Sequence, residues 1–207
     1  MSITITADQV GKKYRKEWIF RRIDLALSSG TSYTFVGPNG SGKSTLLQVL
    51  SGSLPATEGK LTYSINNTQQ EEDTWFRHVS IAAPYLELIE ELTLDELLIF
   101  HQTFKPFKAG LSIDLIIDRM MLQRARHKEI KYYSSGMKQR VKLGLAFFSV
   151  SPVVILDEPT SNLDRQGMNW YRDEVRQLDV DQLLLIGSNQ PDEYDFCPNV
   201  IDVTQWK

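Results

Sequence analysis

The feature that most constrains the fold of this chain is a glycine-rich run near its N-terminal end. The run fits the pattern G-x-x-x-x-G-K-[ST] with no substitution. Its glycines let successive backbone N–H groups converge on phosphate oxygens, where side chains would block the approach. Such a loop joins a strand to the positive N-terminal end of a helix. We therefore expect a phosphate-binding loop made by Gly37, Pro38, Asn39, Gly40, Ser41, Gly42, Lys43, Ser44 and Thr45.

The segments on either side of this loop have the required character. Residues 34–36 predict a short buried strand, and residues 45–50 have the spacing of an amphipathic helix that ends near Gly52. Lys43 supplies a point charge for the terminal phosphates, and the hydroxyl of Ser44 is suited to ligate Mg²⁺. The loop thus indicates a phosphate ligand, but by itself neither a base nor an activity.

Composition limits the remaining choices. The chain has 207 residues, of which 42% are hydrophobic, so it can build a substantial core. A net charge of -3 argues against a dedicated nucleic-acid binder. Cys197 is the only cysteine, so no internal disulfide forms, which suits a reducing compartment. The N-terminus has no signal-peptide pattern and no apolar run approaches membrane-spanning length, so we expect a soluble protein.

Strand-like segments occur along the whole sequence. Alternating residues around Ile3 and again around Ile23 predict strands of an antiparallel patch, and residues 61–65 predict a further strand. Residues 79–82, 153–156 and 183–187 read as buried strands, the last two continuous and apolar, as in a parallel sheet. We expect an α/β fold with a mostly parallel core sheet and an N-terminal antiparallel β subdomain.

A helical block interrupts this core. From about residue 85 to residue 145 the pattern favours helices, so we expect an inserted α-helical subdomain within a single domain of residues 1–207. Thr93 and Glu96 have the spacing of a capping box. Further helices are predicted at residues 114–122 and 170–178. One face of the first helix is expected to carry Leu94, Leu97, Leu98 and His101.

A second chemical signal is an acidic pair at the end of an apolar strand. Asp157 and Glu158 directly follow residues 153–156. In open α/β sheets, ligands bind at the carboxyl ends of the strands. Asp157 can hold the shell of a magnesium ion, and Glu158 can orient or deprotonate an attacking water. The alternative is that the two acidic residues only end the strand and have no chemical role, and the presence of the glycine-rich loop argues against it.

A third signal lies upstream of this pair. The run Ser134, Ser135, Gly136 and Met137 precedes a helix with basic and Gln residues. It resembles the signature motif of ABC-type ATPases, usually L-S-G-G-Q, in which Ser134 and Gly136 match, while Tyr133, Ser135 and Met137 depart from the usual residues. With the two other motifs in place, the chain is identified as resembling the ATP-binding cassette of an ABC transporter over essentially its whole length.

The resemblance implies further roles. Asp164 takes the position of the D-loop aspartate, and Tyr14 that of the aromatic residue that stacks on adenine; a strand aromatic packed on the core is the alternative for Tyr14. Residues 92–97 resemble the start of the family's helical subdomain. Two such domains stack head to tail around two ATP molecules, each held by one subunit's loop and the other's signature. ATP and Mg²⁺ are the implied cofactors.

The sequence departs from the family at two catalytic positions. The slot of the Q-loop glutamine falls at Pro84, and that of the switch histidine at Asn189, or less well at Ser188. Asn189 can donate a hydrogen bond to a γ-phosphate but carries no charge. Lys43, Asp157 and Glu158 remain, so we expect ATP binding and slow hydrolysis.

Three functions remain open. The first is the ATP-hydrolysing subunit of a transporter, cytoplasmic and bound to the inner face of the membrane through separate membrane subunits. The second is a soluble ABC protein acting on ribosomes or nucleic acid, which only the basic run at Arg124, Arg126, Lys128 and Lys131 favours. The third is a regulatory half with negligible turnover. Candidate contacts with membrane subunits are Tyr85, Leu86, Leu88, Ile89, Phe100, Phe104 and Phe107.

Overall fold

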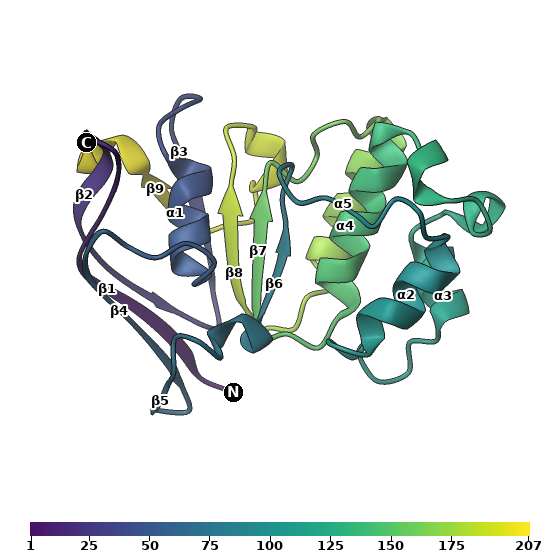
Figure 1. Ribbon diagram of the computed structural model, residues 1–207, viewed down its shortest axis with the longest axis horizontal. Helices are drawn as coiled ribbons and strands as arrows, with labels where there is room; N and C mark the ends of the chain where they lie inside the picture. Colours follow the sequence, from purple (N-terminus) through teal and green to yellow (C-terminus); the bar gives the residue numbers. More distant parts are fainter. The chain divides into compact units, whose positions relative to one another are not determined.

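The computed structural model describes the whole chain from Met1 to Lys207. Its contacts divide it into two compact units (Figure 1). The first unit comprises Met1–Val79, Pro152–Glu158 and Asp179–Lys207, and the second comprises Ser80–Ser151 and Pro159–Leu178. The first unit holds nearly all of the strands and the second holds four of the five α-helices. In chain order the second unit interrupts the first twice, at residues 80–151 and 159–178.

The first unit contains an antiparallel sheet with strand order β2-β1-β4-β5. Alternation places Ile3, Ile5, Ile23 and Leu27 in the core with no exposed surface, as the period-two pattern predicts. A shift of register in β1 follows Asp8, where Gln9 adopts a positive φ of 50°. The strands are β1 (Ile3–Tyr14), β2 (Glu17–Ser28), β4 (Glu58–Ile65) and β5 (Thr68–Gln70).

The second sheet has the order β6-β7-β8-β3-β9. The pairings of β7 with β8, β8 with β3 and β3 with β9 are parallel, which confirms the expected α/β class. Every residue of β7 and β8 is buried, as their continuous apolar sequence predicts. The strands are β3 (Ser32–Val36), β6 (Val79–Ala82), β7 (Val153–Asp157), β8 (Leu183–Gly187) and β9 (Asn199–Asp202).

The helix that follows the glycine-rich run packs against this parallel sheet. It is α1 (Lys43–Leu50), which contacts β7 and β8 and whose three leucines are all buried. Three 3₁₀-helices complete the first unit and carry part of its core, including the fully buried Trp75, which stacks on Tyr63 at 4.4 Å between ring centroids. They are η1 (Trp75–His78), η4 (Pro191–Glu193) and η5 (Val203–Trp206).

The second unit is helical, with a core that includes Leu94, Leu98, Ile116, Val141 and Tyr171, none of which is exposed. Its α-helices are α2 (Leu94–Gln102), α3 (Ile113–Arg119), α4 (Ser135–Phe148) and α5 (Arg165–Val175), and its 3₁₀-helices are η2 (Gln123–Ala125) and η3 (Ile130–Tyr132). In no case is a helix long and apolar enough to cross a lipid bilayer.

The capping box at the start of α2 is confirmed. The Thr93 N–H donates to Glu96 Oε2 at 2.8 Å, and the Glu96 N–H donates to Thr93 Oγ1 at 3.3 Å. Two expected boundaries were wrong. α3 ends at Arg119, because Met121 turns into the left-handed region at φ 57°, and α5 begins at Arg165, five residues before Trp170, because Asp164 caps it.

Candidate nucleotide site

The glycine-rich loop of the first unit has a backbone that few side chains would tolerate. Gly37 has a φ of 145° and Gly42, the N-cap of α1, a φ of 104°. A Cβ on Gly37 would lie 2.8 Å from Ser41 Oγ, and one on Gly42 would lie 2.6 Å from a side-chain carbon of Ile19. These glycines are therefore required by space as well as by conformation.

Lys43 lies at the start of α1 and is only 5% exposed. Its ammonium group donates to the carbonyl oxygen of Gly37 at 2.7 Å and to that of Pro38 at 3.4 Å. These two carbonyl groups thus hold the positive charge of Lys43 inside the loop. An anion seated in the loop would offer this ammonium a stronger, charge-assisted partner.

Asp157, the last residue of β7, is 1% exposed, and neither of its carboxylate oxygens has a hydrogen-bond partner. Burial, aided by the charges of Glu158 and Glu193, raises the pKa of Asp157 to about 6, although the nearby Ser44 hydroxyl and Lys43 ammonium pull that pKa down. A buried carboxylate without partners is costly unless a cation or a donor joins it. Asp157 therefore fits a site for a metal ion.

The neighbouring strand β8 leaves room for this carboxylate. A Cβ on Gly187 would lie 2.8 Å from Asp157 Oδ1 and 2.7 Å from a methyl carbon of Leu47. The carbonyl oxygen of Gly187 accepts a hydrogen bond of 2.8 Å from the backbone N–H of Glu158. Glu158 itself has a φ of 44°, an unfavourable conformation for a non-glycine residue, and this backbone bond helps to hold it.

The loop after β8 reaches the glycine-rich run. Asn189 Oδ1 accepts a hydrogen bond of 3.1 Å from the Gly37 N–H, and its Nδ2 donates to Asn39 Oδ1 at 3.3 Å. The side chain expected from the sequence thus lies in the predicted site, in contact with the loop itself. Within this unit, Lys43, the adjacent Asp157 and Glu158, and Asn189 come together from three different segments of the chain.

Tyr14 ends strand β1, and its side chain is 48% exposed. The Lys12 ammonium lies 5.4 Å from the centroid of the Tyr14 ring and donates to the carbonyl oxygen of Pro55 at 2.6 Å. The ring is therefore not packed into the core, which was the alternative that its sequence position left open. It offers a surface on which a flat ligand can stack.

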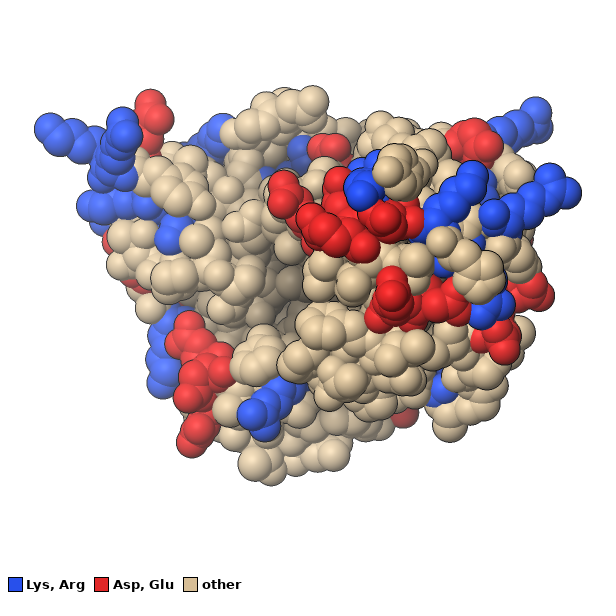
Figure 2. Space-filling view, turned by 45° about the vertical axis from the view of Figure 1, so that its right-hand side comes forward, with Lys and Arg blue, Asp and Glu red and all other residues tan.

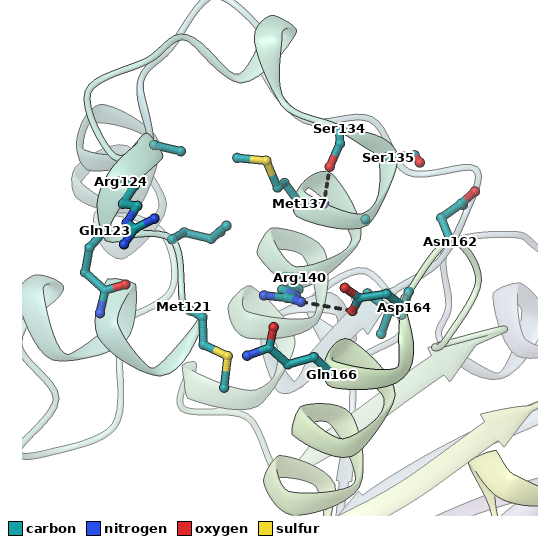
Figure 3. A pocket seen from close by; sticks show the side chains of 14 residues that line it. Met121, Gln123, Arg124, Ser134, Ser135, Met137, Arg140, Asn162, Asp164 and Gln166 are labelled. Carbon is teal, nitrogen blue, oxygen red and sulfur yellow. Dashed lines mark hydrogen bonds and ion pairs between the residues drawn. The ribbon is translucent and has the colours of Figure 1, made fainter.

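The signature run lies in the second unit, at the start of α4. Ser134 is the N-cap of this helix, and its Oγ accepts a hydrogen bond of 3.2 Å from the Met137 N–H. The run lines an open cavity of about 610 Å³ (Figure 3). The lining residues are Met121, Leu122, Gln123, Arg124, Ala125, Ser134, Ser135, Gly136, Met137, Arg140, Asn162, Leu163, Asp164 and Gln166.

Sequence reasoning missed several residues of this cavity. Arg140 Nη2 donates to Asp164 Oδ1 at 3.2 Å (Figure 3). Asp164 also caps α5, because its Oδ1 accepts a hydrogen bond of 2.7 Å from the Gly167 N–H. These interactions, led by the bond from Gly167, lower the pKa of Asp164. Met121 and Gln123 belong to no motif and reach the signature run from a separate turn, whereas Asn162 lies in the run that ends at Asp164.

A second cleft of the helical unit, of about 500 Å³, surrounds Pro84, the residue that the sequence predicts at the position of the Q-loop glutamine. Pro84 contributes only its carbonyl oxygen, which accepts from the Lys142 ammonium at 3.1 Å. The Lys138 ammonium pairs with Glu90. Charged side chains of both signs also lie next to one another on the face of the molecule drawn in Figure 2, where acidic side chains form a group with basic ones beside it. The cleft is lined by Pro84, Leu86, Glu87, Leu88, Glu90, Glu91, Lys138 and Lys142.

The apolar residues singled out near this cleft are largely exposed. Phe104 is 76% exposed and lies edge-on to Phe100 at 5.1 Å between ring centroids. Tyr85, Leu86 and Ile89 are between 38% and 43% exposed, whereas Leu88 and Phe107 are half-buried. Core packing therefore does not account for most of this set.

The basic run is partly neutralised by acidic partners. Arg126 pairs with Asp95 and with Asp114, the latter at 2.9 Å, and Lys131 pairs with Glu129. The chain also has no cluster of three or more His, Cys, Asp or Glu side chains that could hold a metal ion. A cation at Asp157 would thus need further oxygen ligands, such as a hydroxyl and phosphate oxygens.

Together, the parallel sheet, the glycine-rich loop at a helix N-terminus and the buried aspartate at the end of the adjoining strand define the class of P-loop nucleotide-binding proteins. A family model described as "ABC transporter" matches residues 20–161. The chain therefore belongs to the ABC transporter family, as one of its ATP-binding domains.

Several curated proteins are similar to it. ATP-binding cassette sub-family A member 2 of Rattus norvegicus is 26% identical over 98% of this chain and 8% of that protein. The daunorubicin/doxorubicin resistance ATP-binding protein DrrA of Streptomyces peucetius is 32% identical over 84% of this chain and 54% of that protein. The cytochrome c biogenesis ATP-binding export protein CcmA of Rhizobium johnstonii is 30% identical, over 90% and 88% respectively. The chain thus spans only part of the length of many relatives.

Solved structures share the fold. An ATP-bound bacterial Atm1-family ABC exporter superposes with a TM-score of 0.81 and 18% identity, over 98% of this chain and 37% of that one. The dimeric bacterial ABC transporter cassette MJ0796 gives a TM-score of 0.74 and 20% identity, over 97% and 95%. At this identity the likeness concerns the fold.

Proposed function

We propose that this chain is a single ATPase domain that binds ATP with Mg²⁺ and hydrolyses it to drive transport through separate membrane subunits. The observation that carries the proposal is the pairing of an anion-accepting loop with a buried, unpartnered Asp157 in one unit. The loop offers N–H groups and the Lys43 charge to phosphates, while Asp157 and Ser44 suit a metal ion that shares phosphate oxygens.

The remaining groups of the site have complementary roles. Glu158 orients or deprotonates the attacking water, and Asn189 supports the loop through its contacts with Gly37 and Asn39. Tyr14 stacks on the adenine ring. Bound Mg²⁺ would neutralise charge on the transferring phosphoryl group. The residues that contact nucleotide are Tyr14, Gly37, Pro38, Asn39, Gly40, Ser41, Gly42, Lys43, Ser44 and Thr45.

The active form in this proposal is a dimer of ATPase subunits, identical or different. Ser134, Ser135, Gly136 and Met137 of one subunit meet the ATP bound by the other, with Asp164 at the interface. The start of α4 suits this role, because a helix N-terminus with a serine cap attracts a phosphate. The names of the similar proteins, which are ATP-binding and export proteins, support the assignment to transport.

The membrane subunits would bind the second unit, which places the protein in the cytoplasm at the inner face of the membrane. The adjoining, exposed Phe100 and Phe104 support such a contact, as do the exposed Tyr85, Leu86 and Ile89, since apolar side chains that adjoin on a surface mark interfaces. The neutralised arginine and lysine of the basic run disfavour nucleic acid as the alternative partner.

Hydrolysis is slow in this proposal. Pro84 cannot ligate a metal ion or water through its side chain, and Asn189 carries no charge. Loss of one such polar contact costs about 10²- to 10³-fold in other enzymes. At saturating Mg-ATP, a Pro84→Gln/Asn189→His double variant should therefore turn over ATP faster than the natural chain. The second candidate, a regulatory half with negligible turnover, predicts no burst of product when enzyme and Mg-ATP are mixed in a single-turnover experiment.

The decisive experiment uses Glu158→Gln. This change leaves the phosphate loop intact but removes the base, so the variant should form a dimer with Mg-ATP that persists during gel filtration. A Lys43→Ala/Glu158→Gln variant is the matched control, and it should remain monomeric. Monomeric Glu158→Gln at saturating Mg-ATP would contradict the dimer mechanism, and co-purification with membrane proteins tests the partner assignment.

A further inference from the structure

Gly37 is held on both of its polar groups. Its carbonyl oxygen accepts from the Lys43 ammonium at 2.7 Å, and its N–H donates to Asn189 Oδ1 at 3.1 Å. Asn189 spans the start of the loop, because its Nδ2 also donates to Asn39 Oδ1 at 3.3 Å. One amide thus satisfies a backbone donor and a side-chain acceptor two residues apart.

The backbone that precedes Asn189 is fixed in the interior of the unit. The preceding residue, Ser188, has no exposed surface, and its N–H donates to the carbonyl oxygen of Phe35 at 3.1 Å. Its hydroxyl donates to the carboxylate of Glu193, which is also fully buried, and accepts from the Gln190 N–H at 2.9 Å. A buried, hydrogen-bonded turn of this kind fixes the position of Asn189 relative to the glycine-rich loop.

The two bonds to Gly37 differ in what happens to them when a phosphate arrives. The Lys43 ammonium would leave the Gly37 carbonyl for the phosphate, since a charge-assisted bond is stronger than one to a carbonyl. The Asn189 bond occupies the N–H of Gly37, the first residue of the loop, so this N–H is turned toward Asn189 and is not needed by a phosphate. It therefore survives ligand binding and becomes the remaining side-chain contact that fixes Gly37.

The geometry points to Asn189 as a positioning residue that keeps the loop in its phosphate-accepting conformation, and not as a ligand of the γ-phosphate. This inference rests on the proposed function, since it needs the loop to bind nucleotide. A residue that shapes the empty loop affects every ligand that the loop accepts, because the affinity scales with the fraction of protein already in the competent conformation. ADP and ATP should thus depend on Asn189 equally.

The test compares Asn189→Ala, Asn39→Ala and the double variant, with Asn199→Ala as the matched control. Asn199 is a suitable control because its amide also donates two hydrogen bonds, to Thr31 Oγ1 and the Ser32 carbonyl, but away from the loop. Titration calorimetry with ADP and with a non-hydrolysable ATP analogue, both with Mg²⁺, gives the dissociation constants, and thermal unfolding confirms that each variant folds.

The expected result is a rise in both dissociation constants by about 3- to 10-fold in Asn189→Ala, the effect of a neutral hydrogen bond, with their ratio unchanged. The double variant should be less impaired than the product of the single effects, since Asn189 acts partly through Asn39. Asn199→Ala should bind as the natural chain does.

Weaker ATP-analogue binding with natural ADP binding would overturn the inference and make Asn189 a γ-phosphate ligand. Natural affinity for both nucleotides would overturn it as well. If Asn189→Ala does not fold, Asn39→Ala alone decides. An equal rise in the dissociation constants of ADP and the ATP analogue supports the positioning role of the Asn189–Asn39 contact, and an unchanged ADP dissociation constant contradicts it. Failure of the proposed function is distinct, since the natural chain would then bind neither nucleotide.

Discussion

The carbonyl oxygen of Asn162 lies over the α-carbon of Gly136, so close that a Cβ on Gly136 would be 2.8 Å from it. The turn before α5 therefore rests directly on the first turn of α4, and a backbone atom cannot give way as a flexible side chain can. Asp164, two residues after Asn162, is joined to the same helix by Arg140. The signature run and the turn that carries Asp164 are one packed assembly.

The first prediction concerns this contact. Gly136→Ala should lower ATPase activity about 10²-fold, because displacement of catalytic groups by about 1 Å costs that much. Nucleotide binding by the separate subunit, measured with a fluorescent ATP analogue, should be unchanged, since the phosphate loop lies in the other unit. Gly110→Ala is the control for backbone strain alone, because Gly110 has a φ of 82° but a Cβ there meets nothing within 4 Å, and its ATPase activity should be natural. Natural ATPase activity in Gly136→Ala would refute the prediction.

The second prediction concerns Asp157. In the presence of a metal chelator, Asp157→Asn should be more stable than the natural chain by about 1 kcal/mol, because it removes a buried, unpartnered charge. The same variant should lose the stabilisation that Mg-ATP gives the natural chain. Thermal unfolding with and without Mg-ATP measures both effects. Asp8→Asn, on the exposed side of β1, is the control. A less stable Asp157→Asn protein would argue against the unpaired carboxylate.

The third prediction tests the capping box of α2. Thr93→Ala removes the acceptor for the Glu96 N–H and should cost about 1 kcal/mol, or about 2–4 °C in melting temperature. Thr103→Ala at the other end of α2 removes a hydroxyl that donates to the Phe100 carbonyl at 2.7 Å. Because that carbonyl is exposed to solvent at a helix end, the effect should be smaller. Equal decreases in melting temperature in the two variants would contradict the assignment of Thr93 as the N-cap of α2.

The fourth prediction concerns pH. Burial, and to a lesser extent the charge of Lys105, lowers the pKa of His101 to about 4. His101 bonds to Ser149 Oγ at 2.8 Å and stacks on Phe107. The folded protein thus takes up a proton less readily than the unfolded chain, whose histidine titrates near 6.5. The free energy of unfolding is therefore unaffected by the protonation of His101 above pH 6.5. It decreases as the pH falls from 6.5 toward 4, because the unfolded chain binds a proton that the folded protein does not.

The measurement is urea unfolding of the natural chain and of His101→Gln across this pH range. The natural chain should lose more stability than His101→Gln between pH 6.5 and 4, although both lose some through their other groups. Parallel loss in the two proteins would show that the histidine is not kept neutral by the fold.

The sequence predicts those features whose cause is local. The glycine-rich loop, the apolar run before Asp157 and the Thr93–Glu96 cap are each contained in a few consecutive residues, and the fold has all three where expected. The α/β class follows from the same segments.

Features that depend on a distant partner were not predictable. Strand β9 is short and half exposed, and it forms because β3 offers it a parallel edge. Met121 and Asn162 both adopt positive φ beside the signature run, a conformation that no local sequence pattern predicted. The contact of Asn189 with Asn39 joins residues that are 150 positions apart, so only the fold brings them together.

The missing side chain at Gly187 has a consequence for how this sequence can change over generations. The other four residues of β8 are aliphatic and interchangeable in principle with residues of similar volume. At Gly187 any replacement would meet Leu47 and Asp157 at once, on the helix after the loop and on the next strand. Drift at this one position would require two compensating changes elsewhere, so it should be among the slowest positions of the chain to vary.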